Sequence, residues 1–221
     1  MQKDFIITLA WPEGLITAAG SWYDILFSKN GKYRVGHSAI ALINATTNKV
    51  HYFDFGRYHS KEGYGRVRDI ETDPDTRVID AKITKGKIEN IKDILLYLSE
   101  MKSSHGEGKL YASVINNIDF NKAFTYAKNI QNKGMLPYGP FVRSGTNCSR
   151  FVANVIKSSG ASLVKQLRLT YPFCISPSPK RNVGIVNNHY YIAHDKKCIK
   201  IKKSKLKAYF SSIEYKVEKT S

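Results

Sequence analysis

Apolar residues recur at steps of three and four residues in two segments near the middle of the chain. These positions are Ile88, Ile91, Ile94, Leu95 and Leu98 in the first segment, and Phe120, Ala123, Tyr126 and Ala127 in the second. This spacing places the side chains on one face of an α-helix. The pattern therefore predicts two amphipathic helices.

Short apolar runs bounded by turn-forming residues predict strands on both sides of these helices. The expected strands cover residues 5–9, 38–43, 50–55, 77–83, 110–115, 183–186 and 190–193. Strands and helices do not alternate as they do in parallel doubly wound sheets. Because 221 residues are enough to bury one core, we expect a single α+β domain over residues 1–221 with a central antiparallel sheet.

Two of these strands are expected to form a β-hairpin. Residues 44–48, with the sequence Asn-Ala-Thr-Thr-Asn, are rich in turn formers and separate the runs 38–43 and 50–55. Directly opposite residues of such a pair lie side by side. The hairpin therefore brings the start of its first strand close to the end of its second.

The chain is strongly basic, with 35 Lys and Arg residues against 18 Asp and Glu residues and a formal net charge of +17. Such a field favours an anionic partner, although a high charge also serves solubility. The lysine-rich segment 196–207 fits either a protected edge strand or a ligand patch. No nucleic-acid recognition motif is found, so an anionic envelope polymer or lipid is preferred over nucleic acid as partner.

Three cysteines, Cys148, Cys174 and Cys198, leave at least one thiol free. No CxxC or HExxH spacing is found, so neither a metal nor another cofactor is predicted. The apolar run 5–10 is too short for a secretory signal or a membrane span. A cytoplasmic location is therefore expected, with export by a route without a cleavable signal left open.

Cys148 is expected in the first turn of a helix. Its apolar face is formed by Cys148, Phe151, Val152, Val155 and Ile156. Thr146 and Asn147 supply capping chemistry before this face, and Gly160 ends it. A thiol at a helix N-terminus has its pKa of about 8.5 lowered by the helix dipole and nearby N–H groups. The alternative is a buried structural thiol.

A reactive thiolate needs a base, and His37 stands at the start of an apolar strand of the predicted hairpin. Two residues of the partner strand, His51 and Asp54, are candidates to hold the imidazole in position. The expected turn places Asp54 nearer to His37 than His51. An error of one residue in register would move Asp54 to the opposite face.

These residues resemble a known family. Tyr138-Gly139 and Asn147-Cys148-Ser149-Arg150-Phe151-Val152 are similar to the tyrosine and the Asp-Cys-Ser-Gly-Leu-Val signature of NlpC-type cell-wall peptidases. Gly36-His37-Ser38-Ala39-Ile40 is similar to their Gly-His-Val-Gly-Ile strand. In the usual members the cysteine precedes the histidine, whereas here His37 precedes Cys148 by 148 − 37 = 111 residues. This order resembles the YiiX-type and lecithin retinol acyltransferase-like branch.

The resemblance implies a papain-like fold in circularly permuted order, with the sheet packed on the cysteine-bearing helix. It implies Cys148 as nucleophile, His37 as general base and then acid, and Asp54 or His51 as the orienting third residue. Tyr138 is then expected beside the nucleophile, where it helps to line the oxyanion site. Asn147 and Arg150 depart from the family pattern, which has aspartate and glycine there, and this weakens the carry-over of substrate preference.

The expected function is that of a cysteine-dependent hydrolase or acyltransferase that works through an acyl-enzyme. An amidase or peptidase acting on peptidoglycan stem peptides is the first expectation. A lipid ester or amide hydrolase or acyltransferase of the same fold is the second. The third, from another class, is a non-catalytic basic domain that binds nucleic acid or an envelope polymer.

Overall fold

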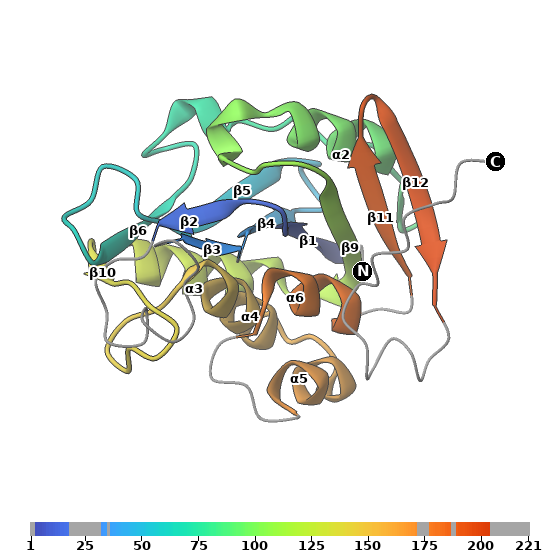
Figure 1. The fold of residues 1–221 in the computed structure, drawn as a ribbon. Coiled ribbons are helices and arrows are strands. Elements are labelled where there is room, and N and C mark those ends of the chain that lie inside the picture. Colours follow the sequence, from blue (N-terminus) through green and yellow to red (C-terminus); the bar gives the residue numbers. More distant parts are fainter. Residues whose placement is uncertain (1–2, 18–31, 35, 172–176, 187–188, 204–221) are drawn as a thin grey trace.

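The computed structural model describes residues 3–17, 32–34, 36–171, 177–186 and 189–203 (Figure 1). Within these residues the centre of the fold is an eight-stranded sheet with the order β10-β6-β5-β4-β1-β9-β11-β12. Neighbouring strands of this sheet are all antiparallel. The strands are β1 (Asp4–Trp11), β4 (His37–Ile43), β5 (Val50–Gly56), β6 (Tyr64–Arg68), β9 (Leu110–Ile118), β10 (Leu136–Pro137), β11 (His189–His194) and β12 (Lys197–Lys202).

Helices cover both faces of this sheet (Figure 1). Helix α2 (Ile91–Glu100) lies on one face, and α3 (Phe120–Gln131), α4 (Cys148–Ser158) and α6 (Pro179–Val186) lie on the other. Helix α5 (Leu163–Thr170) packs outside α4 and α6. Short pieces complete the described elements: the pairs β2 (Leu15–Thr17) with β3 (Lys32–Arg34) and β7 (Ile83–Thr84) with β8 (Lys87–Ile88), and the 3₁₀ helices η1 (Pro74–Thr76) and η2 (Lys102–Ser104).

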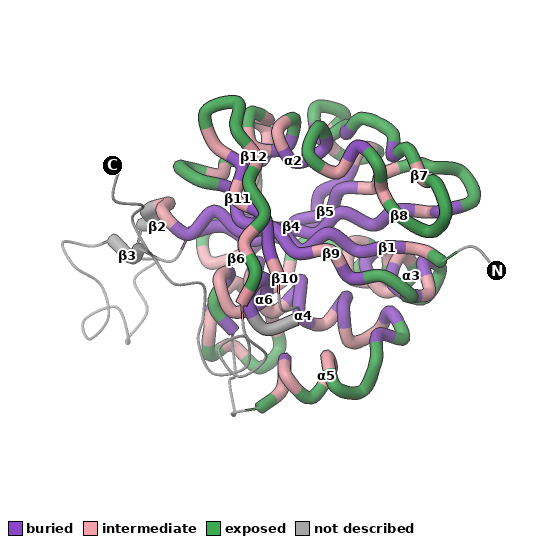
Figure 2. The backbone as a smooth tube through the Cα atoms, turned by 90° about the vertical axis from the view of Figure 1, so that its right-hand side faces the viewer, coloured by how far each residue is buried: buried purple, intermediate pink, exposed green. Residues whose placement is uncertain are grey.

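The two faces of the sheet carry two separate hydrophobic cores. Because side chains alternate along a strand, Ile6 of β1 joins the core under α3 and α4, whereas Phe5 and Ile7 join the core under α2. Both faces of β1 are therefore covered, and the strand is buried from Phe5 to Trp11 (Figure 2). A strand covered on both sides is apolar at nearly every position, which is the pattern seen at 5–11.

The structure confirms the predicted class, an α+β fold with a large antiparallel sheet packed on the cysteine-bearing helix. Both predicted amphipathic helices are present as α2 and α3, and the helix that begins at Cys148 is α4. The strands expected at 5–9, 38–43, 50–55, 110–115 and 190–193 lie within β1, β4, β5, β9 and β11. Part of the lysine-rich segment forms β12 at the edge of the sheet, and 204–207 lie outside the described residues.

Two predicted strands are wrong. Residues 77–82 form no strand, because their apolar side chains insert singly into the core under α2, as Val78 and Ala81 do. Residues 183–186 are the end of α6 instead of a strand. Pro179 begins this helix, where its fixed φ suits the first turn and its missing N–H costs nothing.

Among the described helices, none combines the length and the apolar character needed to cross a lipid bilayer.

Candidate active site

The hairpin of β4 and β5 places a histidine and a carboxylate on the same face of the sheet. Ala39 is paired with Asp54, and His37 lies two residues before Ala39, so both polar side chains point to the α2 side. The Asp54 Oδ2 atom lies 3.1 Å from His37 Nε2. Asp54 is fully buried and His37 is 9% exposed. The imidazole is therefore held by a carboxylate that water does not reach.

A glycine precedes His37 for a steric reason. Gly36 has a φ of +69°, and a Cβ atom there would lie 2.1 Å from the carbonyl oxygen of Trp11. Only glycine tolerates both conditions. The chain thus enters β4 in close contact with the end of β1, and this contact fixes where the His37 side chain begins.

Helix α4 supplies the thiol. Asn147 caps the helix, its side-chain oxygen accepting the Arg150 N–H at 2.8 Å, and Cys148 is the first helical residue. The Cys148 thiol is 3% exposed and hydrogen-bonds to His37. Asp54 lies at Nε2 of the same ring. The Tyr138 O–H donates to Cys148 Sγ at 3.8 Å.

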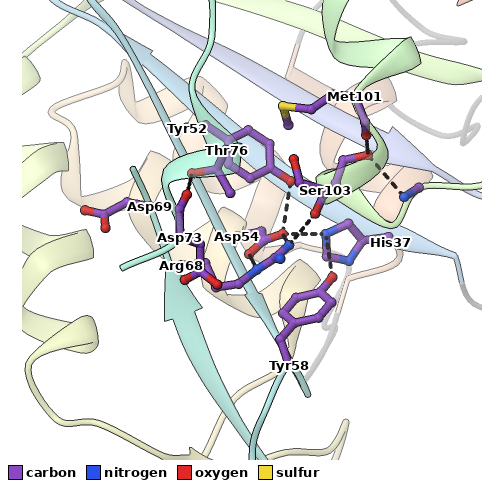
Figure 3. A network of polar contacts seen from close by, with 12 residues as sticks. His37, Tyr52, Asp54, Tyr58, Arg68, Asp69, Asp73, Thr76, Met101 and Ser103 are labelled. Carbon is purple, nitrogen blue, oxygen red and sulfur yellow. Dashed lines mark hydrogen bonds and ion pairs between the residues drawn. The ribbon is translucent and has the colours of Figure 1, made fainter. Parts of the chain in front are cut away.

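A buried arginine from β6 holds the carboxylate of Asp54 in place (Figure 3). Arg68 donates from Nε to Asp54 Oδ1 at 3.0 Å and from Nη2 to Oδ2 at 2.6 Å. The same Nη2 donates to the carbonyl oxygen of Ser103 at 2.9 Å, and the Tyr52 O–H donates to Oδ2 at 3.0 Å. Asp54 is thus a fully partnered acceptor with both oxygens fixed.

Aromatic rings enclose the imidazole of His37. The Trp11 ring stacks on it with centroids 5.9 Å apart, and the Tyr58 ring meets it edge-on at 6.2 Å. The Tyr58 hydroxyl lies 3.5 Å from His37 Nε2, and the Arg68 guanidinium lies 3.5 Å from the centre of the Tyr58 ring. These rings shield the contact between His37 and Asp54 from water, which strengthens it.

The pKa values of the thiol and the imidazole are displaced in opposite directions. Burial alone lowers the pKa of His37, but hydrogen bonds to Asp54 and Cys148 and their negative charges outweigh burial and raise this pKa to about 9. Burial raises the pKa of Cys148, but the hydrogen bond and charge of His37 outweigh it and bring this pKa below its ordinary value. Both displacements favour transfer of the thiol proton to the imidazole, which gives a thiolate beside an imidazolium.

Burial likewise acts against ionisation of Asp54, yet hydrogen bonds from His37 and Arg68 lower the pKa of this carboxyl below its ordinary value. Asp54 is therefore negatively charged at neutral pH. Burial and the charge of Cys148 raise the pKa of Tyr138 well above its ordinary value, so its hydroxyl keeps the proton that it donates to the sulfur.

The loop 139–146, between Tyr138 and Cys148, is closed by one guanidinium. Arg150 donates to the carbonyl oxygens of Gly139, Pro140, Val142 and Gly145 at 2.6 to 3.4 Å. At the base of the loop, Gly139 and Thr146 are joined by a backbone hydrogen bond of 3.1 Å. The loop is therefore a compact piece attached to α4, beside the thiol.

Comparison with known proteins places these features in a family. A model of the type VI secretion system effector TseH-like family matches residues 6–163, which include His37, Asp54, Tyr138 and Cys148. The chain belongs to the TseH-like family of type VI secretion system effectors. The crystal structure of the type VI secretion system effector TseH is similar to it, with a TM-score of 0.63 and 20% sequence identity over 90% of this chain and 98% of that one. At this identity the likeness concerns the fold. A search of curated proteins gave no match.

The structure of this TseH-like chain brings four of the five predicted site residues together: Cys148, His37, Asp54 and Tyr138. It does not bring His51 to them. His51 is paired with Leu42, and its ring lies 5.3 Å from the rings of both Phe120 and Phe124. Residues 51 and 54 are an odd number apart on one strand, so they point to opposite faces.

Sequence reasoning missed Arg68, Tyr58 and the role of Arg150. The alternation Arg66-Val67-Arg68 is the ordinary pattern of a strand with one solvated face, so the sequence carries no signal that Arg68 is buried. No turn-forming segment comparable to 44–48 fixes the register of β6 against β5 in the sequence. Cys198 is, like Cys148, a free thiol, and Cys174 lies outside the described residues.

Proposed function

We propose that this TseH-like chain is a cysteine-dependent hydrolase in which Cys148 is the nucleophile and His37 the general base and acid. The observation that carries the proposal is the position of His37 between Asp54 and Cys148, with the pKa of the imidazole raised to about 9 and the pKa of the thiol lowered. Opposite displacements of this kind are typical of a nucleophile paired with its base.

In the proposed reaction, the Cys148 thiolate attacks the carbonyl carbon of an amide, and a C–S bond forms while the carbonyl oxygen becomes an oxyanion. The backbone N–H groups of the first turn of α4 and the Tyr138 hydroxyl, which donates to the sulfur, are the proposed donors to that oxygen. His37 then gives its proton to the leaving amine as the C–N bond breaks. Water, deprotonated by His37, releases the acyl group as a carboxylic acid and restores the thiol.

Asp54 and Arg68 act in this reaction as positioning residues. Asp54 fixes the imidazole and stabilises the imidazolium. Arg68 fixes both oxygens of Asp54 and compensates its charge in a site that water does not reach. Because the third residue is paired in this way, it remains ionised throughout the reaction.

We propose further that the fold is papain-like in permuted order, as in the YiiX-type and lecithin retinol acyltransferase-like branch, and that the substrate is an amide bond in peptidoglycan stem peptides. Three observations support this substrate. The motifs around Cys148 and His37 resemble those of cell-wall peptidases, the family consists of secretion-system effectors, and the net charge of +17 suits an anionic envelope polymer.

The first test measures thiol activation without any substrate. The rate of alkylation of Cys148 by iodoacetamide is followed against pH in the parent and in the His37→Ala variant, with labelling at Cys148 counted by peptide mass spectrometry. We expect the alkylation rate of the parent to rise at a lower pH than that of an ordinary thiol, and this displacement to be lost in the variant, since His37 lowers the thiol pKa. An ordinary and equal thiol pKa in both proteins would refute the catalytic pair.

The second test addresses the substrate. Purified peptidoglycan is incubated with the parent or with Cys148→Ala, and the released fragments are identified by chromatography and mass spectrometry. New peptide termini that require Cys148 support the amidase. If the parent releases fatty acid from lipid esters and leaves peptidoglycan intact, the substrate is a lipid instead of peptidoglycan. If the Cys148→Ala protein keeps the full biological effect of the parent, the proposed hydrolase is wrong and the chain is a non-catalytic binding domain.

A further inference from the structure

A cavity of about 420 Å³ lies on the α2 side of the sheet. Strand residues of β1, β9, β11 and β12 line it together with the β8 segment and the first residue of α2. Phe5 of β1 lines the cavity, whereas His37 is paired with Trp11, six residues further along β1. At about 3.3 Å per residue this separates the cavity from the candidate active site by roughly 20 Å.

The polar residues of the cavity carry positive charge or hydrogen-bonding groups. Lys87 and Lys200 line it together with Asn116 and His189, and its lining contains no carboxylate. The acidic residues closest in sequence are Asp4, Glu89 and Asp93, and none of them is part of the lining. Asp4 instead accepts hydrogen bonds from the backbone N–H groups of Ala45 and Phe120. The cavity therefore presents two ammonium groups without an acidic partner in its wall.

The imidazole of His189, which also lines the cavity, lies in the positive field of nearby lysines. Burial lowers the pKa of His189, and the charges of Lys200, Lys165 and Lys202 lower it further. At neutral pH His189 is thus uncharged, with one ring nitrogen able to donate and the other to accept a hydrogen bond. Asn116, which is exposed, adds an amide that does both.

The remaining wall is apolar and aromatic. Phe5 and Tyr191 are buried at 3% and 9% exposure, and Val114, Ile88 and Ile91 complete the floor. The Lys200 ammonium lies 5.6 Å from the centre of the Tyr191 ring. A hollow of this volume that combines apolar and aromatic surface with a few convergent polar groups is suited to a small molecule with both polar and apolar parts.

We propose that this cavity is a second binding site, for a sugar that bears a phosphate or carboxylate group. Lys87 and Lys200 bind the anionic group, His189 and Asn116 bind hydroxyl groups, and Tyr191 with the apolar floor packs against the body of the sugar. The site is separate from the Cys148 chemistry and does not depend on the proposed hydrolase.

The test titrates the full chain with glucose 6-phosphate, glucuronate, glucose and inorganic phosphate, and follows backbone and Asn116 side-chain signals by two-dimensional NMR. The variant is Lys87→Gln with Lys200→Gln. The matched control is Lys197→Gln. Lys197 is an exposed lysine of β12, like Lys200, but it is paired with His194 and points to the opposite face of the sheet from Lys200. All three altered residues are exposed, and thermal unfolding verifies that the variants fold.

We expect saturable binding of glucose 6-phosphate or glucuronate by the parent, an affinity at least tenfold lower in the double variant, and parental affinity in Lys197→Gln. Preference between the two ligands identifies the anionic group as phosphate or carboxylate. Equal losses in both variants, equal binding of glucose, or equal binding of inorganic phosphate would overturn the site. Alkylation of Cys148 is expected to be unchanged in the double variant, so this result is independent of the test of the hydrolase.

Discussion

Replacing Arg68 by methionine removes the partner of a buried carboxylate while keeping a side chain of similar length. Arg68 and Asp54 have side-chain exposures of 3% and 0%, and their closest atoms are 2.6 Å apart. In the variant, Asp54 keeps the contacts of His37 and Tyr52 but loses two charge-assisted hydrogen bonds. The carboxylate cannot recover them from water, because no water reaches it.

The expected cost follows from this burial. Removing one partner of a buried ion pair destabilises a protein by about 3–5 kcal/mol. Two hydrogen bonds to a charged group at about 1.5–3 kcal/mol each give a similar figure. For a chain of this size a loss of 1 kcal/mol lowers Tm by about 2–4 °C, so the variant is expected to lose roughly 6–20 °C.

The assay is thermal unfolding followed by circular dichroism, with Arg66→Met as matched control. Arg66 lies on the same strand and forms two hydrogen bonds of 2.7 Å to Asp73 and one of 3.0 Å to the carbonyl oxygen of Tyr58, but the Arg66 and Asp73 side chains are 21% and 12% exposed. Because water can partly solvate Asp73 when Arg66 is lost, this change is expected to cost less than the loss of Arg68. The double variant Arg68→Met with Asp54→Asn should be more stable than the sum of the two single changes predicts, because neither charge is then left alone.

Equal losses of Tm in Arg68→Met and Arg66→Met would refute this reasoning. So would a strictly additive double variant, since the two side chains would then contribute independently of each other.

Three further changes test the remaining contacts of the site. Asp54→Asn removes the hydrogen bond and the charge that raise the pKa of His37. The change in the rate of Cys148 alkylation that accompanies deprotonation of the imidazolium, expected near pH 9 in the parent, should therefore move to lower pH. Tyr138→Phe removes a donor to the thiolate worth about 0.5–1.5 kcal/mol, so alkylation at pH 6 should slow by about two- to tenfold while Tm falls by about 1–6 °C. Asn147→Ala removes the cap of α4 and should lower the free energy of unfolding, measured in urea, by about 1 kcal/mol.

The contact between His37 and Asp54 could be predicted because it is local. The turn formers at 44–48 lie between two apolar runs, and a turn centred on Thr46 and Thr47 gives the register that pairs Ala39 with Asp54. The same reasoning separates His51 from His37. His51 lies three residues before Asp54 on β5, so its side chain points to the opposite face of the sheet. The position of Cys148 could be predicted for a similar reason, because the cap at Asn147 and the apolar face of α4 lie in adjacent residues of the sequence.

Arg68 and Tyr58 could not be predicted in this way. Their positions depend on how β6 pairs with β5 after a loop whose length does not fix the register. The segment 77–83 shows the converse, because its apolar residues resemble a strand although each is inserted separately beneath α2. Periodicity reports which side chains are buried, and it reports the backbone only where neighbouring residues share one surface.

The compact loop held by Arg150 has a consequence for how the protein folds. Its contacts join residues close in sequence, from Tyr138 to Arg150, so this half of the site can form early and locally. The other half needs the meander of β4, β5 and β6, and the two halves meet only when α4 docks on the sheet across 111 residues of sequence, 148 − 37. A fast-reacting Cys148 therefore appears last, and its alkylation rate during refolding measures the completion of tertiary structure.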